Sequence, residues 1–350
     1  MQTKNIAING FGRIGRSSVR LWWQGYQDLL NLVAINTSGS MPLEGWAHLL
    51  KHDTNYGSFG TEITFKEHQS NKEVTDEDPV LGVLVIGGHE ITITAQRDPA
   101  KLPWKKFEVD IVMEATGRFL TQEDASLHRR AGAKKVLLTA PAKSPEITTS
   151  VIGVNKFDLS QDIFSNASCT TNCVAPVVKV INDKIGIEKA ILTTIHAYTD
   201  SQNLLDNSHK DLRRARAAAM NLVPATTGAA KATTKIIPEL KNKFDGMAVR
   251  VPTPTGSLSD MVFITKKPVT KEEVNQVLVE ASQSPEFLGV LAVSEEPIVS
   301  SDIVGRPESS IVDLPLTQVV DGNLLKIISW YDNEWGYCAR LLDQMCLIEV

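Results

Sequence analysis

The sequence lacks most features that mark specialised protein classes. Its 350 residues include only four cysteines (Cys169, Cys173, Cys338 and Cys346), too few for a disulfide framework, so we expect a reducing, cytoplasmic setting. No apolar run approaches the length of a membrane span, and we expect no signal or transit segment before the first strand. A formal net charge of −5 gives no support for nucleic-acid binding. The composition is that of a globular protein large enough for two domains.

Strand and helix signals alternate through the first part of the chain. Apolar strand-like runs lie at 4–9, 32–36, 79–88, 89–95, 109–117 and 134–142, and helical patterns lie at 15–23, 43–51 and 121–133. This alternation predicts an α/β fold with a doubly wound parallel sheet and some antiparallel additions.

The pattern changes after Ser168. A helix is expected over 169–185, followed by long strand-like runs at 189–199, 246–254, 258–267 and 323–333, which suit a mostly antiparallel sheet. The polar stretch 200–220 is too long for a plain connection, and is therefore functional or disordered. We predict a dinucleotide-binding domain over 1–167 and an α+β catalytic domain over 168–334, with an amphipathic C-terminal helix (335–350) docked on the first domain.

A glycine-rich turn follows the first strand. Gly10, Gly12 and Gly15 have the G-x-G-x-x-G spacing between a strand and a helix, which lets the backbone approach a dinucleotide pyrophosphate at the helix N-terminus. Such folds usually place an acidic residue roughly 20 residues further on to hold the adenosine ribose. Here the second strand runs into Thr37 and Ser38 instead, so the usual ribose clamp is missing.

A cysteine and a histidine are candidates for nucleophilic catalysis. Cys169 opens a predicted helix with Ser168 as its N-cap, where the helix dipole favours a thiolate. His196 lies near the end of a strand, within reach of a helix-start cysteine as its base. Spacing alone leaves the alternative that both residues are structural. Cys173, one turn further along, is expected to be an inert core residue.

Eight segments, in this order, resemble phosphorylating glyceraldehyde-3-phosphate dehydrogenases. They are "INGFGRIGR", "EATGRF", "TAPAK", "NASCTTNC", "HKDLRRARAAA", "TTGAAKA", "RVPTPTGSLSD" and "WYDNEWGY", and they span nearly the whole chain. The resemblance implies a Rossmann-type cofactor domain and an oxidation of D-glyceraldehyde 3-phosphate to 1,3-bisphosphoglycerate through a cysteine hemithioacetal and thioester. Cys169 would be the nucleophile and His196 the base.

The same resemblance implies two phosphate pockets. Thr199 and Arg250 would hold the substrate phosphate. Inorganic phosphate would be held by five residues: Ser168, Thr170, Arg214, Thr227 and Gly228. Guanidinium groups, hydroxyls and backbone amides suit this role.

The resemblance also assigns cofactor contacts. Asn333 would bind the nicotinamide carboxamide, Arg13 and Ile14 would lie beside the pyrophosphate, Thr116 and Gly117 would line the ribose, and Thr139 would lie towards the nicotinamide.

Two departures from the NAD-restricted pattern concern the adenosine end. Thr37 replaces an aspartate that repels a 2′-phosphate, and Asn207-Ser208 replaces a Leu-Pro or Gly-Pro pair. Thr37, Ser38 and Ser208 offer hydroxyls, and Arg97 offers a cation near the adenine. We therefore expect use of NADP as well as NAD, with a preference for NADP; neutral drift with NAD retained is the alternative.

Two other functions are alternatives to this one. An erythrose-4-phosphate dehydrogenase would use the same cysteine and histidine but turn over without phosphate, and a catalytically lapsed NAD(P)-binding protein would act through partners. No metal site is expected, because His48 and His52 have no third ligand. The resemblance implies a homotetramer with the loop around Ser208 at a subunit contact, no nucleic-acid or membrane partner, and a small-molecule substrate.

Overall fold

The protein folds into two compact units in the computed structural model, which describes residues 3–156, 158 and 160–350. The first unit contains the described residues up to 149, those between 158 and 167, and 341–350. The second contains 150–156 and 168–340. The first thus combines segments from both ends of the chain.

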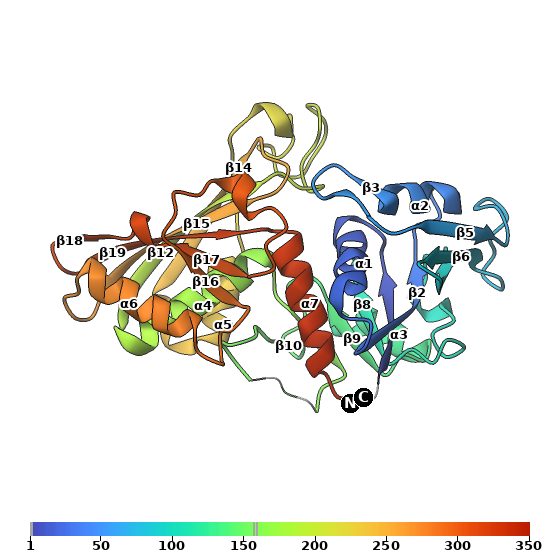
Figure 1. The fold of residues 1–350 in the computed structure, drawn as a ribbon, viewed down its shortest axis with the longest axis horizontal. Helices are drawn as coiled ribbons and strands as arrows, with labels where there is room; N and C mark the ends of the chain where they lie inside the picture. Colours follow the sequence, from blue (N-terminus) through green and yellow to red (C-terminus); the bar gives the residue numbers. More distant parts are fainter. Residues whose placement is uncertain (1–2, 157, 159) are drawn as a thin grey trace. The chain divides into compact units, whose positions relative to one another are not determined.

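The first unit is built on a nine-stranded sheet in the order β10-β11-β9-β8-β1-β2-β7-β6-β5 (Figure 1). Its strands are β1 (Lys4–Asn9), β2 (Leu30–Asn36), β5 (Ile63–Glu67), β6 (Val80–Ile86), β7 (His89–Thr94), β8 (Ile111–Glu114), β9 (Lys135–Leu138), β10 (Thr148–Thr149) and β11 (Ile163–Ser165). Strands β10 to β7 pair in parallel, whereas β5 and β6 are antiparallel additions. The predicted doubly wound sheet is confirmed.

Three helices and a short hairpin belong to this unit. They are α1 (Arg13–Gly25), α2 (Leu43–Lys51), α3 (Gln122–Arg130) and the hairpin of β3 (His52–Asp53) with β4 (Gly57–Ser58). The central strands are buried on both faces, as expected of a covered parallel sheet: Ile6, Leu32 and Val112 have no exposed surface. Because β1, β2, β8 and β9 pair in parallel, their carboxyl ends meet at one edge of the sheet.

The second unit contains an eight-stranded sheet in the order β13-β14-β12-β15-β19-β17-β16, with β18 paired to β19. Its strands are β12 (Ile187–Ala197), β13 (Val223–Thr226), β14 (Phe244–Val251), β15 (Ser257–Thr265), β16 (Leu291–Ser294), β17 (Ser310–Asp313), β18 (Gln318–Val320) and β19 (Leu324–Tyr331). Most pairs are antiparallel, as predicted, but β12 with β14 and β16 with β17 are parallel.

Helices cover one face of this second sheet. They are α4 (Cys169–Lys184), α5 (Ala229–Ile236) and α6 (Lys271–Ser282), and α4 contacts the other two helices as well as β19 (Figure 1). The apolar stripe of α4 is fully buried at Val174, Val177, Val178 and Ile181, which anchors its first residue, Cys169, rigidly. Helix α7 (Trp335–Leu347) begins in the second unit and ends in the first.

No helix in the described part of the chain has both the length and the apolar character needed to cross a membrane.

Candidate active site and nucleotide-binding edge

The turn between β1 and α1 has glycines for two different reasons. A Cβ at Gly15 would lie 2.2 Å from the carbonyl oxygen of Gly10, so the turn itself cannot accommodate a side chain there. A Cβ at Gly12 would meet nothing within 4 Å. Gly12 is also the N-cap of α1, where no side chain caps the helix and no acidic residue occupies the first turn. This open helix N-terminus fits a bound pyrophosphate.

Arg13 and Ile14 form the first turn of α1. The Arg13 guanidinium contacts the Asp53 carboxylate of the β3–β4 hairpin at 2.5 and 3.2 Å. Burial acts to raise the pKa of Asp53, but the hydrogen bond and charge of Arg13, together with the Asn55 and Tyr56 amides, hold it below its ordinary value. The Arg13 side chain therefore fastens the hairpin to α1.

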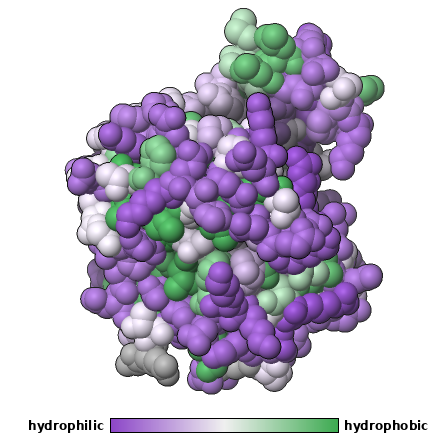
Figure 2. Space-filling model, turned by 90° about the vertical axis from the view of Figure 1, so that its right-hand side faces the viewer, coloured by the Kyte–Doolittle hydropathy of each residue, from purple (hydrophilic) through white to green (hydrophobic). Residues whose placement is uncertain are grey.

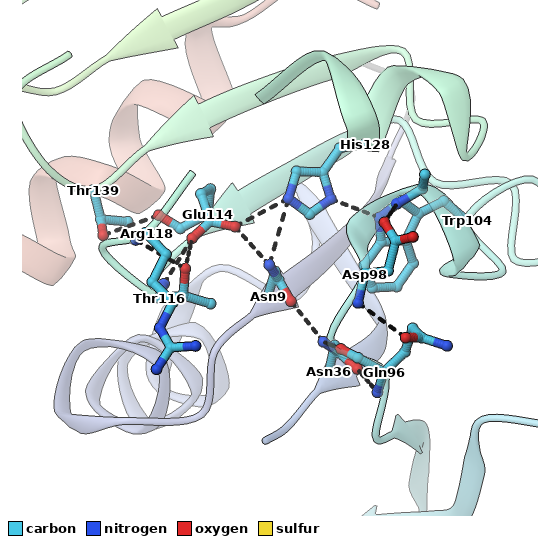
Figure 3. Close-up of polar contacts among 11 residues, drawn as sticks. Asn9, Asn36, Gln96, Asp98, Trp104, Glu114, Thr116, Arg118, His128 and Thr139 are labelled. Carbon is cyan, nitrogen blue, oxygen red and sulfur yellow. Dashed lines mark hydrogen bonds and ion pairs between the residues drawn. The ribbon is translucent and has the colours of Figure 1, made fainter. Parts of the chain in front are cut away.

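Thr116, Gly117 and Thr139 follow β8 and β9 at the carboxyl edge of the first sheet, where ligands bind in such folds. The Thr116 amide donates to Glu114 Oε1 at 2.8 Å, and the Thr139 amide and hydroxyl donate to the Glu114 carbonyl, both at 3.1 Å (Figure 3). The two loops are thereby held to the same strand end.

The segment after β2 differs from the sequence expectation. Thr37 is only 2% exposed, and its hydroxyl donates to the Thr94 carbonyl at 3.0 Å, so the expected Thr37 hydrogen bond to a 2′-phosphate is not available in this conformation. Ser38 is exposed, with its hydroxyl 2.9 Å from that of Ser40, which sequence reasoning had not singled out. Arg97 is exposed, and its neighbour Gln96 donates its backbone N–H to Asn36 Oδ1 at 2.9 Å.

Cys169 and His196 meet in the second unit. Cys169 is the first residue of α4, and the Ser168 hydroxyl caps that helix by accepting the Thr171 amide at 3.2 Å. Ala167, just before the cap, has a left-handed φ of 56°, which turns the chain sharply into the helix. Cys169 Sγ lies 3.5 Å from His196 Nε2. The predicted pairing of a helix-start thiol with a strand-end imidazole is thus present.

Burial dominates the electrostatics of this pair. It raises the pKa of the Cys169 thiol, and the Arg250 charge and the Thr170 hydrogen bond oppose this only in part. Burial and the Arg250 charge lower the pKa of His196 to about 3. The N-terminus of α4 is expected to favour the thiolate, and burial of the Cys169 thiol acts against this effect.

Arg250 reaches this pair through strand register. Parallel pairing of β12 with β14 places His196 directly opposite Arg250. The Arg250 guanidinium lies 2.7 Å from His196 Nδ1 and donates to the Ala197 carbonyl at 3.0 Å. A cation is therefore fixed next to the imidazole and near the thiol.

The other predicted phosphate residues occupy loops of the same unit. Arg214 donates to the Ser201 hydroxyl at 3.1 Å and to the Thr226 carbonyl at 3.2 Å, and Ser201 is 2.9 Å from the Thr199 hydroxyl. Ser201 thus connects Arg214, predicted for inorganic phosphate, with Thr199, predicted for the substrate phosphate. The sequence analysis did not identify Ser201. At the start of α5, the Thr227 hydroxyl accepts the Ala229 amide at 3.2 Å and Gly228 faces open space.

Thr170 and Ser208 have contrasting surroundings. The buried Thr170 hydroxyl lies 2.9 Å from the Tyr331 hydroxyl and 4.0 Å from Cys169 Sγ, so it lies beside the thiol. Ser208 is exposed in the long loop, where its amide donates to Asn207 Oδ1 at 2.7 Å.

Comparison with known proteins identifies the family. The model of the glyceraldehyde 3-phosphate dehydrogenase NAD binding domain matches residues 4–122, and the model of the C-terminal domain matches residues 168–333. The chain belongs to the glyceraldehyde-3-phosphate dehydrogenase family. Glyceraldehyde-3-phosphate dehydrogenase 2 of a Nostoc species is 49% identical over 97% of this chain and 96% of its own. The chloroplastic glyceraldehyde-3-phosphate dehydrogenase A of Chlamydomonas reinhardtii is 47% identical over 97% of this chain and 87% of its own.

Membership of this dehydrogenase family makes the chain an oxidoreductase with a nicotinamide cofactor. The domain models correspond to the first unit up to the start of α3 and to the second unit from Ser168 onward. The relatives include chloroplastic and bacterial enzymes.

Sequence reasoning missed two further groups in this dehydrogenase. The Tyr331 hydroxyl lies 2.9 Å from both the Thr170 and the Thr194 hydroxyls, and its ring is edge-on to the imidazole of His196. The Ser257 hydroxyl accepts the Ala197 amide at 3.1 Å and donates to Asn333 Oδ1 at 2.7 Å, which fixes the orientation of the Asn333 side chain. Both lie in the motifs "RVPTPTGSLSD" and "WYDNEWGY", which were the available signal.

Proposed function

We propose that this chain catalyses the reversible, phosphorylating oxidation of D-glyceraldehyde 3-phosphate to 1,3-bisphosphoglycerate with NAD(P). The observation that carries the proposal is the 3.5 Å approach of His196 Nε2 to Cys169 Sγ at the start of a rigid, buried helix. Family membership supports the substrate, and the catalytic geometry supports the chemistry.

The residues divide the reaction between nucleophile and base. Cys169 attacks the aldehyde carbon while His196 takes the thiol proton at Nε2, since Nδ1 lies 2.7 Å from the Ala197 carbonyl and donates to it. The bound nicotinamide supplies a hydride acceptor. His196 returns the thiol proton to the hemithioacetal oxygen and then takes the hydroxyl proton back as the hydride leaves the carbon and the thioester forms. Inorganic phosphate then displaces the thiolate, which regains a proton from His196. The amides at the N-terminus of α4 face the developing oxyanion.

Two basic pockets would hold the phosphates. Thr199 and Arg250 are proposed to bind the substrate phosphate. Ser168, Thr170, Arg214, Thr227 and Gly228 are proposed to bind the attacking phosphate. Arg250 beside the catalytic imidazole and Gly228 at an uncrowded helix start support this assignment. Since Arg214 and Thr199 share Ser201 as a partner, the pockets are coupled.

Thirteen residues are proposed to bind the cofactor: Gly10, Gly12, Arg13, Ile14, Gly15, Thr37, Ser38, Arg97, Thr116, Gly117, Thr139, Ser208 and Asn333. NADP is proposed to be accepted as well as NAD, with a preference for NADP, because a buried threonine replaces the carboxylate that would repel a 2′-phosphate. Thr37 would permit NADP because it carries no negative charge to repel the 2′-phosphate. Ser38 and Arg97 are exposed and would contact the adenosine end of the cofactor.

The test measures kcat/KM for NADP and NAD with glyceraldehyde 3-phosphate, with and without inorganic phosphate. We expect turnover that requires phosphate and comparable or better efficiency with NADP. A strong preference for NAD would refute the 2′-phosphate assignment, and turnover independent of phosphate would favour an erythrose-4-phosphate dehydrogenase. Activity that survives alkylation of Cys169 would refute the mechanism.

A cytoplasmic homotetramer is proposed for the assembly. The loop between β12 and β13 carries five strongly exposed apolar side chains, and Figure 2 shows such apolar surface on the segment at the top of the view. They are Leu204, Leu205, Leu212, Met220 and Leu222, each at least 70% exposed. A patch of this kind marks a protein contact. Sedimentation equilibrium tests it: a monomer at micromolar concentration would contradict the assembly.

A further inference from the structure

A buried carboxylate lies directly beneath the cofactor edge of the first unit. Glu114, at the end of β8, and His128, on α3, have no exposed surface. Glu114 Oε2 lies 3.0 Å from His128 Nε2, and within the described ranges it pairs with no lysine or arginine. Burying an ionisable group is costly unless hydrogen bonds compensate for the lost hydration, so its partners define what it does.

Four donors converge on this carboxylate. The Thr116 amide and hydroxyl both donate to Oε1. Asn9 Nδ2 and His128 Nε2 donate to Oε2 (Figure 3). Three of these donors, the Thr116 N–H, Asn9 Nδ2 and the His128 ring N–H, can only donate, so both oxygens of Glu114 are used as acceptors. Hydrogen bonds from β1, from the segment after β8 and from α3 thus hold the carboxylate.

Trp104 fixes the tautomer of His128. The indole N–H can only donate, and it lies 3.0 Å from His128 Nδ1, so that nitrogen carries a lone pair. The His128 proton is therefore on Nε2 and points at Glu114. Asn9 Nδ2 lies 3.4 Å from His128 Nε2, and these two donors share Glu114 Oε2 as their acceptor.

The amide orientations are fixed in the same way. Asn36 Oδ1 accepts hydrogen bonds from the backbone N–H of Gln96 and from the Thr94 hydroxyl, both at 2.9 Å. Asn36 Nδ2 must therefore donate to Asn9 Oδ1, which lies 2.7 Å away. Asn9 Nδ2 is consequently directed at Glu114. The donors form a one-way chain from β7 through β2 and β1 to the carboxylate at the end of β8.

We infer that Glu114 is a positioning residue that preorganises the dinucleotide-binding edge through Thr116, Asn9 and the Trp104–His128 pair. Two direct partners of Glu114 lie at this edge: Asn9 precedes the glycine turn, and Thr116 begins the Thr116–Gly117 loop. Asn36 and Gln96, which reach Glu114 through Asn9, precede Thr37 and Arg97. The inference rests on the proposed function only in that NAD(P) binds at this edge. Glu114 acts on cofactor affinity and leaves the chemical step to the second unit.

Glu114→Gln is the direct test, because three of the four donors cannot become acceptors. These are the Thr116 N–H, Asn9 Nδ2 and His128 Nε2. A glutamine oxygen facing Asn9 and His128 puts its amino group against the Thr116 N–H, which releases that loop. We expect the Kd for NAD to rise roughly 5- to 100-fold, the cost of one unsatisfied buried hydrogen bond, with kcat at saturating NAD changed less than about twofold. Glu123→Gln, the same change at an exposed site on α3, is the control.

A charge swap distinguishes positioning by the carboxylate from simple loss of packing. In N9D/E114Q the carboxylate moves to position 9, where it accepts from the new amide at position 114, from His128 and from Asn36. We expect N9D alone to bind NAD poorly, because two buried carboxylates face each other, and the double variant to recover part of the affinity. A double variant weaker than E114Q alone would contradict the inference.

Hydrogen exchange in the wild-type protein keeps the inference testable if the variants do not fold. The Thr116 amide is expected to be protected before NAD is added and to change little on binding. An amide that exchanges freely in the apo protein and becomes protected only with NAD would overturn the inference. So would E114Q protein with a lower thermal midpoint but an unchanged Kd. Wild-type protein that binds NAD but does not oxidise glyceraldehyde 3-phosphate would refute the proposed reaction alone.

Discussion

Replacing Arg250 with glutamine tests how the charge beside the catalytic pair sets thiol reactivity. The guanidinium lies 2.7 Å from His196 Nδ1, and Cys169 Sγ lies 3.5 Å from the other ring nitrogen, so one imidazole separates cation and sulfur. At a separation of about 8 Å and an effective dielectric constant of about 20, the attraction is worth ~2 kcal/mol and favours the thiolate.

Two effects of this substitution oppose each other. Loss of the cation raises the pKa of the Cys169 thiol further, which lowers the thiolate fraction. It also raises the pKa of His196 from about 3, which favours proton transfer from sulfur to the ring. Because the thiol pKa is already raised and the imidazole pKa is far below neutrality, we expect the first effect to decide.

The assay is iodoacetamide alkylation of Cys169 at pH 7, followed by peptide mapping that separates Cys169 from Cys173 and Cys346. We expect R250Q to slow alkylation roughly 10- to 30-fold, in proportion to the thiolate fraction. Arg216→Gln, which removes an exposed arginine paired with Asp206, should leave the rate unchanged. Alkylation of R250Q as fast as or faster than wild type would show that the pair ionises together and would refute the reasoning.

Three further predictions concern the first unit. Thr37→Asp should lower kcat/KM for NADP by roughly 100-fold through repulsion of the 2′-phosphate while sparing NAD, and equal losses in steady-state assays with both would contradict the cofactor proposal. The pKa of Asp53 is lowered in the folded state, so the stabilisation from its pair with Arg13 is present above its unfolded pKa, about 4. This stabilisation disappears as pH falls through the lower folded pKa. The difference in urea midpoint between wild type and Asp53→Asn should therefore shrink between pH 6 and pH 3. Gly15→Ala should destabilise the protein by about 1–3 kcal/mol in thermal unfolding, since its Cβ would lie 2.2 Å from the Gly10 carbonyl oxygen, whereas Gly25→Ala, which meets nothing within 4 Å, should not.

Local patterns were sufficient for the elements that bury a regular apolar stripe. The predicted strand at 4–9 coincides with β1, and the predicted helix over 169–185 ends one residue beyond α4. The strand expected over 109–117 is shorter, because Thr116 folds back onto the Glu114 carboxylate and ends β8 at that residue. Such an ending depends on a side chain contact that no local pattern encodes.

The candidate site was accessible from motifs, but its electrostatics were not. Helix-start position correctly placed Cys169 near His196, whereas the raised thiol pKa depends on burial, which the sequence does not specify. The parallel pairing that puts Arg250 opposite His196 joins strands separated by a long loop, so its register could not be predicted from spacing. Ser257 and Tyr331 were missed because their partners, Asn333 and Thr194, are far from them in the sequence.

The inclusion of residues 341–350 in the first unit affects the order in which the protein folds during synthesis. Leu341, Leu342, Met345 and Ile348 are fully or almost fully shielded from water, and Lys4 donates to the carbonyls of Met345 and Cys346 at 3.2 and 2.6 Å. The ribosome makes the glycine turn first, yet the unit around it lacks part of its core until residues 341–350 have been added. The second unit can therefore be complete before the first, and a nascent chain stalled before residue 341 would contain a folded second unit with its nucleophile while the first unit still lacked part of its core.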